Sequence, residues 1–231
     1  MALRNIGINF EHYALVEFDP SAIKSYNSIH GTNFEPTDIT KIHGKDLKVV
    51  DTEKYCYIVT YSFPCQDLSV AGKMRGMEKG SGTRSSLLFE VGRLIDEVEN
   101  LPQILLMENV PQVISKKNEQ AFKQWTDILE EKGYRNYIQI LNAKDYGVAQ
   151  SRKRCFMVSI LGSMSYQFPD PVPLDKCMKD YLEDEVEEKY YITSEKAKKL
   201  IDKLIVGGKI LTDRQTDRQT DRQTDRQTDR Q

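Results

Sequence analysis

Apolar positions along the chain fall into two recurring patterns, short dense runs and longer stretches with helical spacing. The short runs are rich in β-branched and aromatic residues and predict strands at 13–18, 55–63, 102–109, in "YIQILNA" and in "RCFMVSILG". The longer stretches repeat apolar residues every three or four positions and predict helices over 86–100 and 118–134, while Pro20 and Gly31 bracket a third. Strands that alternate with helices indicate an α/β domain with a mostly parallel sheet.

Three of the predicted strands end in polar or reactive residues. Glu17 ends the first, the loop that holds Cys65 follows the second, and Glu108 ends the third. Ligands of open α/β sheets bind where the carboxyl ends of the strands meet. The sequence therefore predicts that these three distant segments come together at one crevice.

Composition limits the kinds of partner and the cell compartment. The net charge is −2, so nucleic-acid binding has to come from local basic loops rather than from bulk charge. The 4 cysteines have no paired spacing, which predicts neither a disulfide framework nor a metal site. No apolar stretch approaches the roughly 18 residues that span a bilayer, and no signal peptide opens the chain. We expect a cytoplasmic protein without a membrane partner.

The last residues, 212–231, repeat one tetrapeptide, "TDRQ". They contain no apolar residue and their charges cancel, which predicts a disordered tail, with no function of its own as the simplest interpretation. The four-base unit ACAG, read in triplets, encodes Thr-Asp-Arg-Gln. A slippery run of such units would let the gene switch its C-terminus by reading frame, a hypothesis that synonymous codons breaking the period would contradict.

Cys65 stands in a turn, between Pro64 and Gln66, and not in an apolar run. A cysteine displayed in this way can act as a nucleophile if its surroundings stabilise the thiolate. By itself the tripeptide is weak evidence, because a lone loop cysteine is more often incidental. A thiol hydrolase is excluded more directly, because no histidine lies near any of the motifs and such an enzyme needs one.

Two further motifs carry candidate chemistry. Glu108 leads "ENV" at the end of an apolar run, where a poorly solvated carboxylate suits acid–base work or hydrogen bonding to a heterocycle. Arg152 and Arg154 begin a predicted strand and should point the same way, as paired guanidiniums that hold phosphate or carbonyl oxygens do. Taken singly, a turn cap and surface basic residues are the alternatives.

Together the motifs form a specific ordered set. The segments "SFPCQDLSVAGKMRG", "TRSSLLFEVGRLI", "MENVP" and "LNAKDYGVAQSRKRCFMV" resemble, in sequence and in order, the blocks of the DNA cytosine-5 methyltransferase family. The resemblance covers roughly residues 1–195. It implies an α/β fold, a Rossmann-like methyltransferase sheet with helices on both faces.

The resemblance also implies roles for the motif residues. Cys65 would attack C6 of a cytosine flipped out of duplex DNA, and Glu108 would hold the base. Arg152 and Arg154 would hold the base carbonyl and orient the catalytic loop, over 66–83. Substrate-binding roles are implied for four more residues, Gln66, Ser69, Asn109 and Gln150.

The implied cofactor is S-adenosyl-L-methionine. Glu17 matches the family's acid that takes the ribose hydroxyls, and a strand-end carboxylate is a good partner for a diol. Phe18 would then lie against the adenine and Asp38 near its amine. Pro64 and Leu87 would line the same pocket.

The chain also departs from the family pattern. The glycine-rich first turn, of the F-x-G-x-G type, the first strand, the target-recognition domain and the C-terminal return segment do not appear. We therefore expect a partial catalytic domain over 1–190, the helical start of a recognition region over 191–211 and the tail over 212–231. Such a chain should be marginally stable and bind the cofactor weakly.

Three interpretations of function remain open at this stage. The first is the catalytic half of a DNA cytosine-5 methyltransferase of a bacterial restriction–modification system. It would be inactive or weak unless a complementary polypeptide or another reading frame completes it, as in a split or phase-variable enzyme. The second is an inactive truncated remnant. The third is an RNA cytosine-5 methyltransferase, which shares the Pro-Cys and Glu-Asn-Val blocks. The Pro-Cys-Gln form and the repeat favour DNA.

Overall fold

A computed structural model describes residues 2–64, 87–183, 185–190 and 193–208. The chain forms two compact units, Met1–Met178 and Lys179–Gln231, and the candidate site lies entirely in the first. The predicted tail, 212–231, falls outside the described residues. The predicted domain boundaries at 190 and 211 remain predictions.

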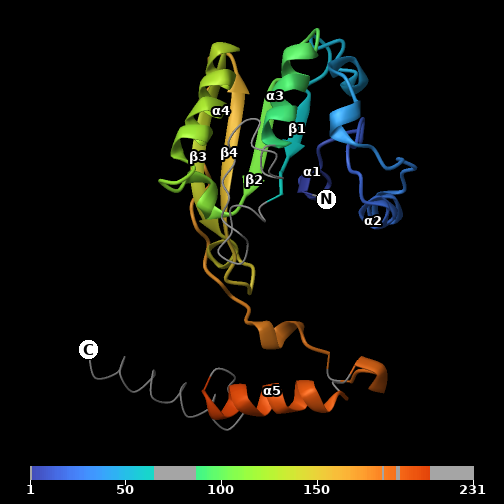
Figure 1. Cartoon of the computed structure of the whole chain (residues 1–231), viewed down its shortest axis with the longest axis vertical. Coiled ribbons are helices and arrows are strands. Elements are labelled where there is room, and N and C mark those ends of the chain that lie inside the picture. Colours follow the sequence, from blue (N-terminus) through green and yellow to red (C-terminus); the bar gives the residue numbers. More distant parts are fainter. Residues whose placement is uncertain (1, 65–86, 184, 191–192, 209–231) are drawn as a thin grey trace. The chain divides into compact units, whose positions relative to one another are not determined.

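A four-stranded mixed sheet forms the centre of the first unit (Figure 1). Its order is β1-β2-β4-β3, with bounds Ile58–Tyr61 for β1, Ile104–Asn109 for β2, Tyr134–Asn142 for β3 and Lys153–Leu161 for β4. β1 runs parallel to β2, but β4 is antiparallel to both of its neighbours. The prediction of a mostly parallel sheet is therefore wrong. The short 143–152 connection between β3 and β4 explains why, since a parallel crossover needs about a dozen residues or more.

Helices occur where helical spacing predicted them. Asp19 caps the first predicted helix by accepting hydrogen bonds from the amides of Ser21 and Ala22, and Gly31 ends it with φ 67°. The helices are α1 (Ala2–Asn5), α2 (Pro20–His30), α3 (Leu88–Glu97) and α4 (Glu119–Glu131), and the 3₁₀ helices of this unit are η1 (Ile39–Lys41), η2 (Gly44–Leu47), η4 (Pro111–Ile114) and η5 (Ala143–Asp145).

The hydrophobic core lies between the sheet and the helices α3 and α4, which lie side by side on the same face (Figure 1). Trp125 of α4 is fully buried there, and its indole N–H donates to the hydroxyl of Tyr61 on β1 at 3.1 Å. The sequence predicted helices on both faces of the sheet, and α3 and α4 together cover one of these faces. The core side chains of α3 and α4 are those that the sequence placed on one face, including Leu88, Val91, Ile95, Phe122 and Leu129.

The predicted strand at 13–18 does not form a strand. A strand requires a neighbour that pairs with its backbone, and the apolar pattern alone supplies none. The segment is instead attached by the carbonyl of Glu17, which accepts a hydrogen bond from the amide of Thr37 at 2.7 Å, and by the ring of Tyr13, which packs edge-on against Tyr57. Glu17 is nonetheless brought to the site, without the sheet that was expected to hold it.

The second unit contains the predicted late helix. Helix α5 covers Glu195–Val206 and begins at Ser194, whose hydroxyl accepts a hydrogen bond from the amide of Ala197. Two short 3₁₀ helices precede it, η6 (Met178–Tyr181) and η7 (Glu188–Tyr190). Within the described residues, no helix combines the length and apolarity needed to cross a bilayer.

Candidate active site

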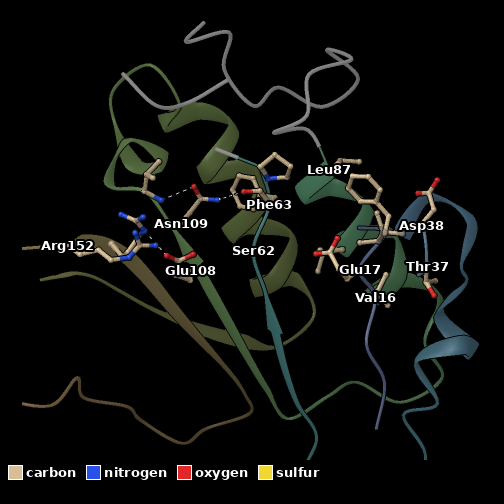
Figure 2. Close-up of a pocket in the computed structure, with 16 residues that line it drawn as sticks. Val16, Glu17, Thr37, Asp38, Ser62, Phe63, Leu87, Glu108, Asn109 and Arg152 are labelled. Atoms are coloured by element: carbon tan, nitrogen blue, oxygen red, sulfur yellow. Dashed lines mark hydrogen bonds and ion pairs between the residues drawn. The ribbon is translucent and has the colours of Figure 1, made fainter. Parts of the chain in front are cut away.

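One cavity of about 630 Å³ joins the segments that the sequence singled out (Figure 2). This volume lies within the roughly 300–1,000 Å³ that is usual for small-molecule sites. Its walls come from the N-terminal segment, the carboxyl ends of β1 and β2, the start of α3 and the start of β4. The lining residues are Val16, Glu17, Phe18, Thr37, Asp38, Ile39, Ser62, Phe63, Pro64, Leu87, Val91, Glu108, Asn109, Val110, Arg152 and Arg154.

Asn109 connects the ends of the two parallel strands. Its side chain is buried, and its Nδ2 donates to the carbonyl oxygen of Phe63 at 3.0 Å. Its Oδ1 accepts from the amide of Val110 at 2.8 Å. Both ends of the side-chain amide are thus used by backbone groups. This fixes the backbone just before Pro64, where the chain enters the Pro-Cys-Gln segment.

Glu108 and Arg154 form an ion pair at one end of the cavity (Figure 2). Oε1 of Glu108 lies 2.8 Å from Nε of Arg154, and the carboxylate is still 38% exposed. Period-two alternation places Glu108 on the sheet face opposite the buried Met107 and Asn109. The carboxylate is therefore oriented by a cation and remains accessible to a ligand.

Arg152 lies directly before β4 and is held through its backbone. Its amide donates to Oδ1 of Asn142 at 2.9 Å, and its carbonyl accepts from the amide of Ala143 at 3.0 Å. Its side chain lines the cavity together with that of Arg154. Both arginines therefore contribute to the wall of the same cavity, and their joint role stays a prediction.

Two carboxylates, Glu17 and Asp38, mark the other end of the cavity, with Phe63 between the two ends (Figure 2). The carboxylate of Glu17 accepts from the amide of Asp19 at 2.9 Å. That of Asp38 accepts from the amide of Thr40 at 3.0 Å and from its hydroxyl at 2.8 Å. These hydrogen bonds to Thr40, the backbone one first, lower the pKa of Asp38. Asp38 is therefore a charged acceptor at neutral pH.

Comparison with known proteins decides the family. The family model of the C-5 cytosine-specific DNA methylase matches residues 1–229. The chain belongs to this family.

Two curated relatives have closely similar sequences. The orphan methyltransferase M.SssI of Spiroplasma monobiae is 44% identical over 168 residues, which are 71% of this chain and 42% of that protein. The type II methyltransferase M2.ScrFI of Lactococcus lactis subsp. cremoris is 43% identical over 150 residues, 64% of this chain and 41% of that protein. This C5 methylase chain thus spans less than half the length of either relative.

Solved structures show the same fold. The S. pombe Dnmt2 methyltransferase aligns with 85% of this chain and 59% of its own, with a TM-score of 0.64 and 24% identity. The Entamoeba histolytica methyltransferase EhMeth gives a TM-score of 0.64 at 22% identity over 81% of this chain and 56% of its own. The α/β methyltransferase fold that the sequence predicted is confirmed.

The side chains of the acidic end fit a nucleoside cofactor of the kind that the family uses. Two carboxylates with accessible oxygens face the cavity, where they can accept hydrogen bonds from hydroxyl and amino groups. Phe18 is 73% exposed and free to cover a planar ring. Leu87 and Val91 of the α3 region supply apolar surface to the same end. These residues fit S-adenosylmethionine.

Most of the candidate residues that the structure describes line this one cavity. They are Glu17, Phe18, Asp38, Pro64, Leu87, Glu108, Asn109, Arg152 and Arg154. Gln150 is exposed and does not line it. Cys65, Gln66 and Ser69 lie outside the described residues. The individual roles remain predictions for this C5 methylase.

Sequence reasoning missed the residues that complete the walls. They are Val16, Thr37, Ile39, Ser62, Phe63, Val91 and Val110. All but two, Ser62 and Val91, adjoin a predicted residue in the chain, so the ends of the predicted segments already pointed to them. Val91 belongs to the apolar spacing that predicted the helix over 86–100. Its position four residues after Leu87, on the same helical face, was the available signal.

Proposed function

We propose that this chain carries the base-binding and part of the cofactor-binding machinery of a DNA (cytosine-5)-methyltransferase. One observation supports this most strongly. A single cavity joins the Glu108–Arg154 pair to the Glu17 and Asp38 carboxylates, and Pro64 also lines it. An enzyme that transfers a group from a nucleoside cofactor to a base needs both ends in one cavity, so that the reacting atoms meet.

The base end activates cytosine for attack. One oxygen of Glu108 accepts a hydrogen bond from the exocyclic amine, and the other, when it carries a proton, donates to N3 of the ring. Arg154 keeps the carboxyl group oriented. Cys65 follows Pro64 directly in the chain, and its thiolate adds to C6. The new S–C6 bond makes C5 enamine-like and able to accept a methyl group. Loss of the C5 proton and expulsion of the thiolate then restore the aromatic ring.

The opposite end holds the cofactor. Glu17 binds the ribose hydroxyls and Asp38 the adenine amine, with Phe18 and Leu87 against the ring. When bound, S-adenosylmethionine supplies an electrophilic methyl group. Glu17 and Asp38 take part in no covalent step. Their contribution is to bind and orient the cofactor.

The proposed substrate is duplex DNA with the target cytosine flipped into the cavity, because a stacked cytosine does not expose C6 to a side chain. The basic residues of 66–83, Lys73, Arg75 and Lys79, would contact phosphates. We further propose a restriction–modification context, which the type II names of relatives such as M2.ScrFI support.

A complementary polypeptide is the proposed partner. The chain spans 42% and 41% of the two curated relatives. Among the described strands β1 has a neighbour on one side only, so its other edge has unpaired backbone groups beside the cavity. A strand added there would complete the wall between β1 and the segment that carries Glu17.

The absence of a strand at 13–18 favours a second candidate, a remnant without turnover. In this case the cavity would keep its residues but bind the cofactor too weakly for reaction. The two candidates differ in one respect that can be measured, namely whether supplying the rest of the protein produces methyl transfer.

The test is a chimera in which the matching segment of this chain replaces the 168 aligned residues of M.SssI. Incubation with methyl-labelled S-adenosylmethionine and long duplex DNA should give 5-methylcytosine. Cys65→Ala should abolish it, while Lys123→Ala, on the exposed side of α4, should not change it. A folded chimera that transfers nothing while parental M.SssI is active would favour the remnant. Transfer to duplex RNA but not to DNA would contradict the proposed substrate.

A further inference from the structure

Arg93, on the second turn of the cavity helix α3, connects this helix to the segment that carries Asp38. We propose that Arg93 is a positioning residue for the cofactor end of the site, holding the segment 38–44 against α3 so that Asp38 faces the cavity. The identity of the ligand in this inference rests on the proposed function. Its geometry rests on hydrogen bonds between described residues. Arg93 itself does not line the cavity.

The guanidinium of Arg93 uses three of its nitrogens on three different acceptors. Its Nε donates to Oε2 of Glu90 at 2.9 Å and its Nη1 to Oε1 of Glu97 at 2.8 Å, both on the same helix. Its Nη2 donates to the carbonyl oxygen of Ile39 at 3.0 Å, 54 positions away in the chain. The two carboxylates therefore fix the rotamer that presents the third donor to Ile39.

Glu97 makes a second attachment to the same distant segment. Its Oε2 accepts from the amide of Gly44 at 2.9 Å and lies 3.3 Å from Nδ1 of His43. The backbones also approach closely here, because a Cβ placed on Gly44 would lie 2.4 Å from the carbonyl carbon of Glu97. Arg93 and Glu97 thus hold the 39–44 segment at both of its ends.

These attachments align two walls of the cavity. Asp38 and Ile39 form one wall. The other wall is formed by Leu87, directly before α3, and by Val91, in the first turn of α3. An isolated ion pair on a helix surface contributes little to stability. The Arg93–Glu97 pair differs because its two side chains also bind backbone groups of a separate segment, the carbonyl of Ile39 and the amide of Gly44. Without them, the described hydrogen bonds of this segment are local, such as those between Asp38 and Thr40.

The test uses the full 231-residue chain and compares Arg93→Gln with the matched control Lys123→Gln. The control breaks the Lys123–Asp127 pair, which also has i,i+4 spacing but joins two residues of α4. Hydrogen exchange of peptides covering 38–47 is measured first. We call the attachments of Arg93 and Glu97 to residues 39–44 the clamp. Loss of the clamp in Arg93→Gln should raise the exchange rate of this segment roughly tenfold, which is the effect of one or two lost hydrogen bonds. The control should leave the exchange rate unchanged.

The second measurement is binding of S-adenosylmethionine and of its analogue with hypoxanthine in place of adenine. A loss of overall stability weakens the binding of both ligands by the same factor. Displacement of Asp38 instead reduces the preference for the adenine ligand over the hypoxanthine analogue, because the analogue lacks the amine that Asp38 binds. We expect Arg93→Gln to reduce the adenine preference several-fold and Lys123→Gln to keep it.

The outcomes separate this inference from the proposed function. Exchange in 38–47 that is unchanged in Arg93→Gln, or raised equally in the control, overturns the clamp. Faster exchange together with an unchanged adenine preference overturns its role in positioning Asp38. A wild-type chain that binds neither ligand contradicts the cofactor assignment for the isolated chain, and the exchange comparison then decides the clamp by itself.

Discussion

Arg154, near the start of β4, makes an ion pair with Glu108, near the end of β2, with 2.8 Å between Nε and Oε1. The two strands are antiparallel neighbours, so the start of one and the end of the other meet at the same edge of the sheet. The antiparallel insertion of β4 is therefore what brings the motif around 150–154 to the motif around 108. A parallel β4 would have presented its opposite end.

Replacing Arg154 should affect catalysis more than folding. In Arg154→Met the carboxylate of Glu108 loses the cation that orients it, and methyl transfer by the chimera should fall by about a hundredfold. The unfolding free energy should change by less than about 1 kcal/mol, because the pair is partly exposed. Arg135→Met on β3, which removes a hydrogen bond to the carbonyl of Ser163 away from the cavity, is the control. Full activity of Arg154→Met would contradict the orienting role.

Asn109→Asp should destabilise the entrance to the Pro-Cys-Gln segment. The substitution keeps the shape of the side chain but replaces the N–H donor to Phe63 with a second acceptor facing a carbonyl oxygen. A buried acceptor left unpaired costs about 1–3 kcal/mol, measured as the free energy of unfolding in urea. Asn5→Asp, on an exposed position of α1, should leave this value unchanged. An equal loss in both variants would show a general charge effect instead.

Tyr61→Phe tests the packing of the sheet on α4. The substitution keeps the edge-on ring contact with Trp125 but leaves the buried indole N–H without its acceptor. Unfolding free energy should fall by about 1–3 kcal/mol. The matched control is Tyr55→Phe, at a side chain that is 51% exposed, where no change is expected. A Tyr61→Phe chain as stable as wild type would mean that water or relaxation satisfies the indole.

How far the sequence predicts this molecule depends on which interactions are local. Helix bounds follow from caps and spacing, as with Asp19 and Gly31 around α2. The order of the strands does not, since the apolar runs of β2 and β4 do not specify that they pair, and β4 runs opposite to the other three described strands. The strand predicted at 13–18 failed for the same reason, because pairing partners lie far away in the chain.

The candidate site was easier to predict than the sheet. Glu17, Asp38, Glu108 and the two arginines follow from motif order, and the structure brings them to one cavity. What the sequence did not reveal is the support around them. Arg93 and Glu97 appear in the sequence only as charges on the solvent side of a helix. Their role depends on contacts to Ile39 and Gly44 that no local pattern encodes.

Cys155 should report on folding by its pH-dependent reactivity. Its thiol is buried beside the core of β4, and burial raises its pKa from 9.0 to about 11. Because the folded pKa lies above the unfolded one, this group's contribution to stability is present below about pH 9 and is lost as pH rises toward 11. A thiol reagent at pH 8 should modify exposed Cys56 quickly and Cys155 only on unfolding, as read by peptide mass spectrometry. Equal rates at both sites in native buffer would contradict this burial.

The central claim is that Cys65 forms a covalent adduct with cytosine, and mechanism-based trapping tests it directly. The chimera is mixed with S-adenosylmethionine and a long duplex made with 5-fluorocytosine in place of cytosine, so that every sequence context is present. We predict a denaturation-resistant protein–DNA complex that maps to Cys65, that Cys65→Ala abolishes and that Cys155→Ala retains. A complex that persists in Cys65→Ala, or a folded, DNA-binding chimera that forms none, would contradict the assignment of Cys65 as the nucleophile.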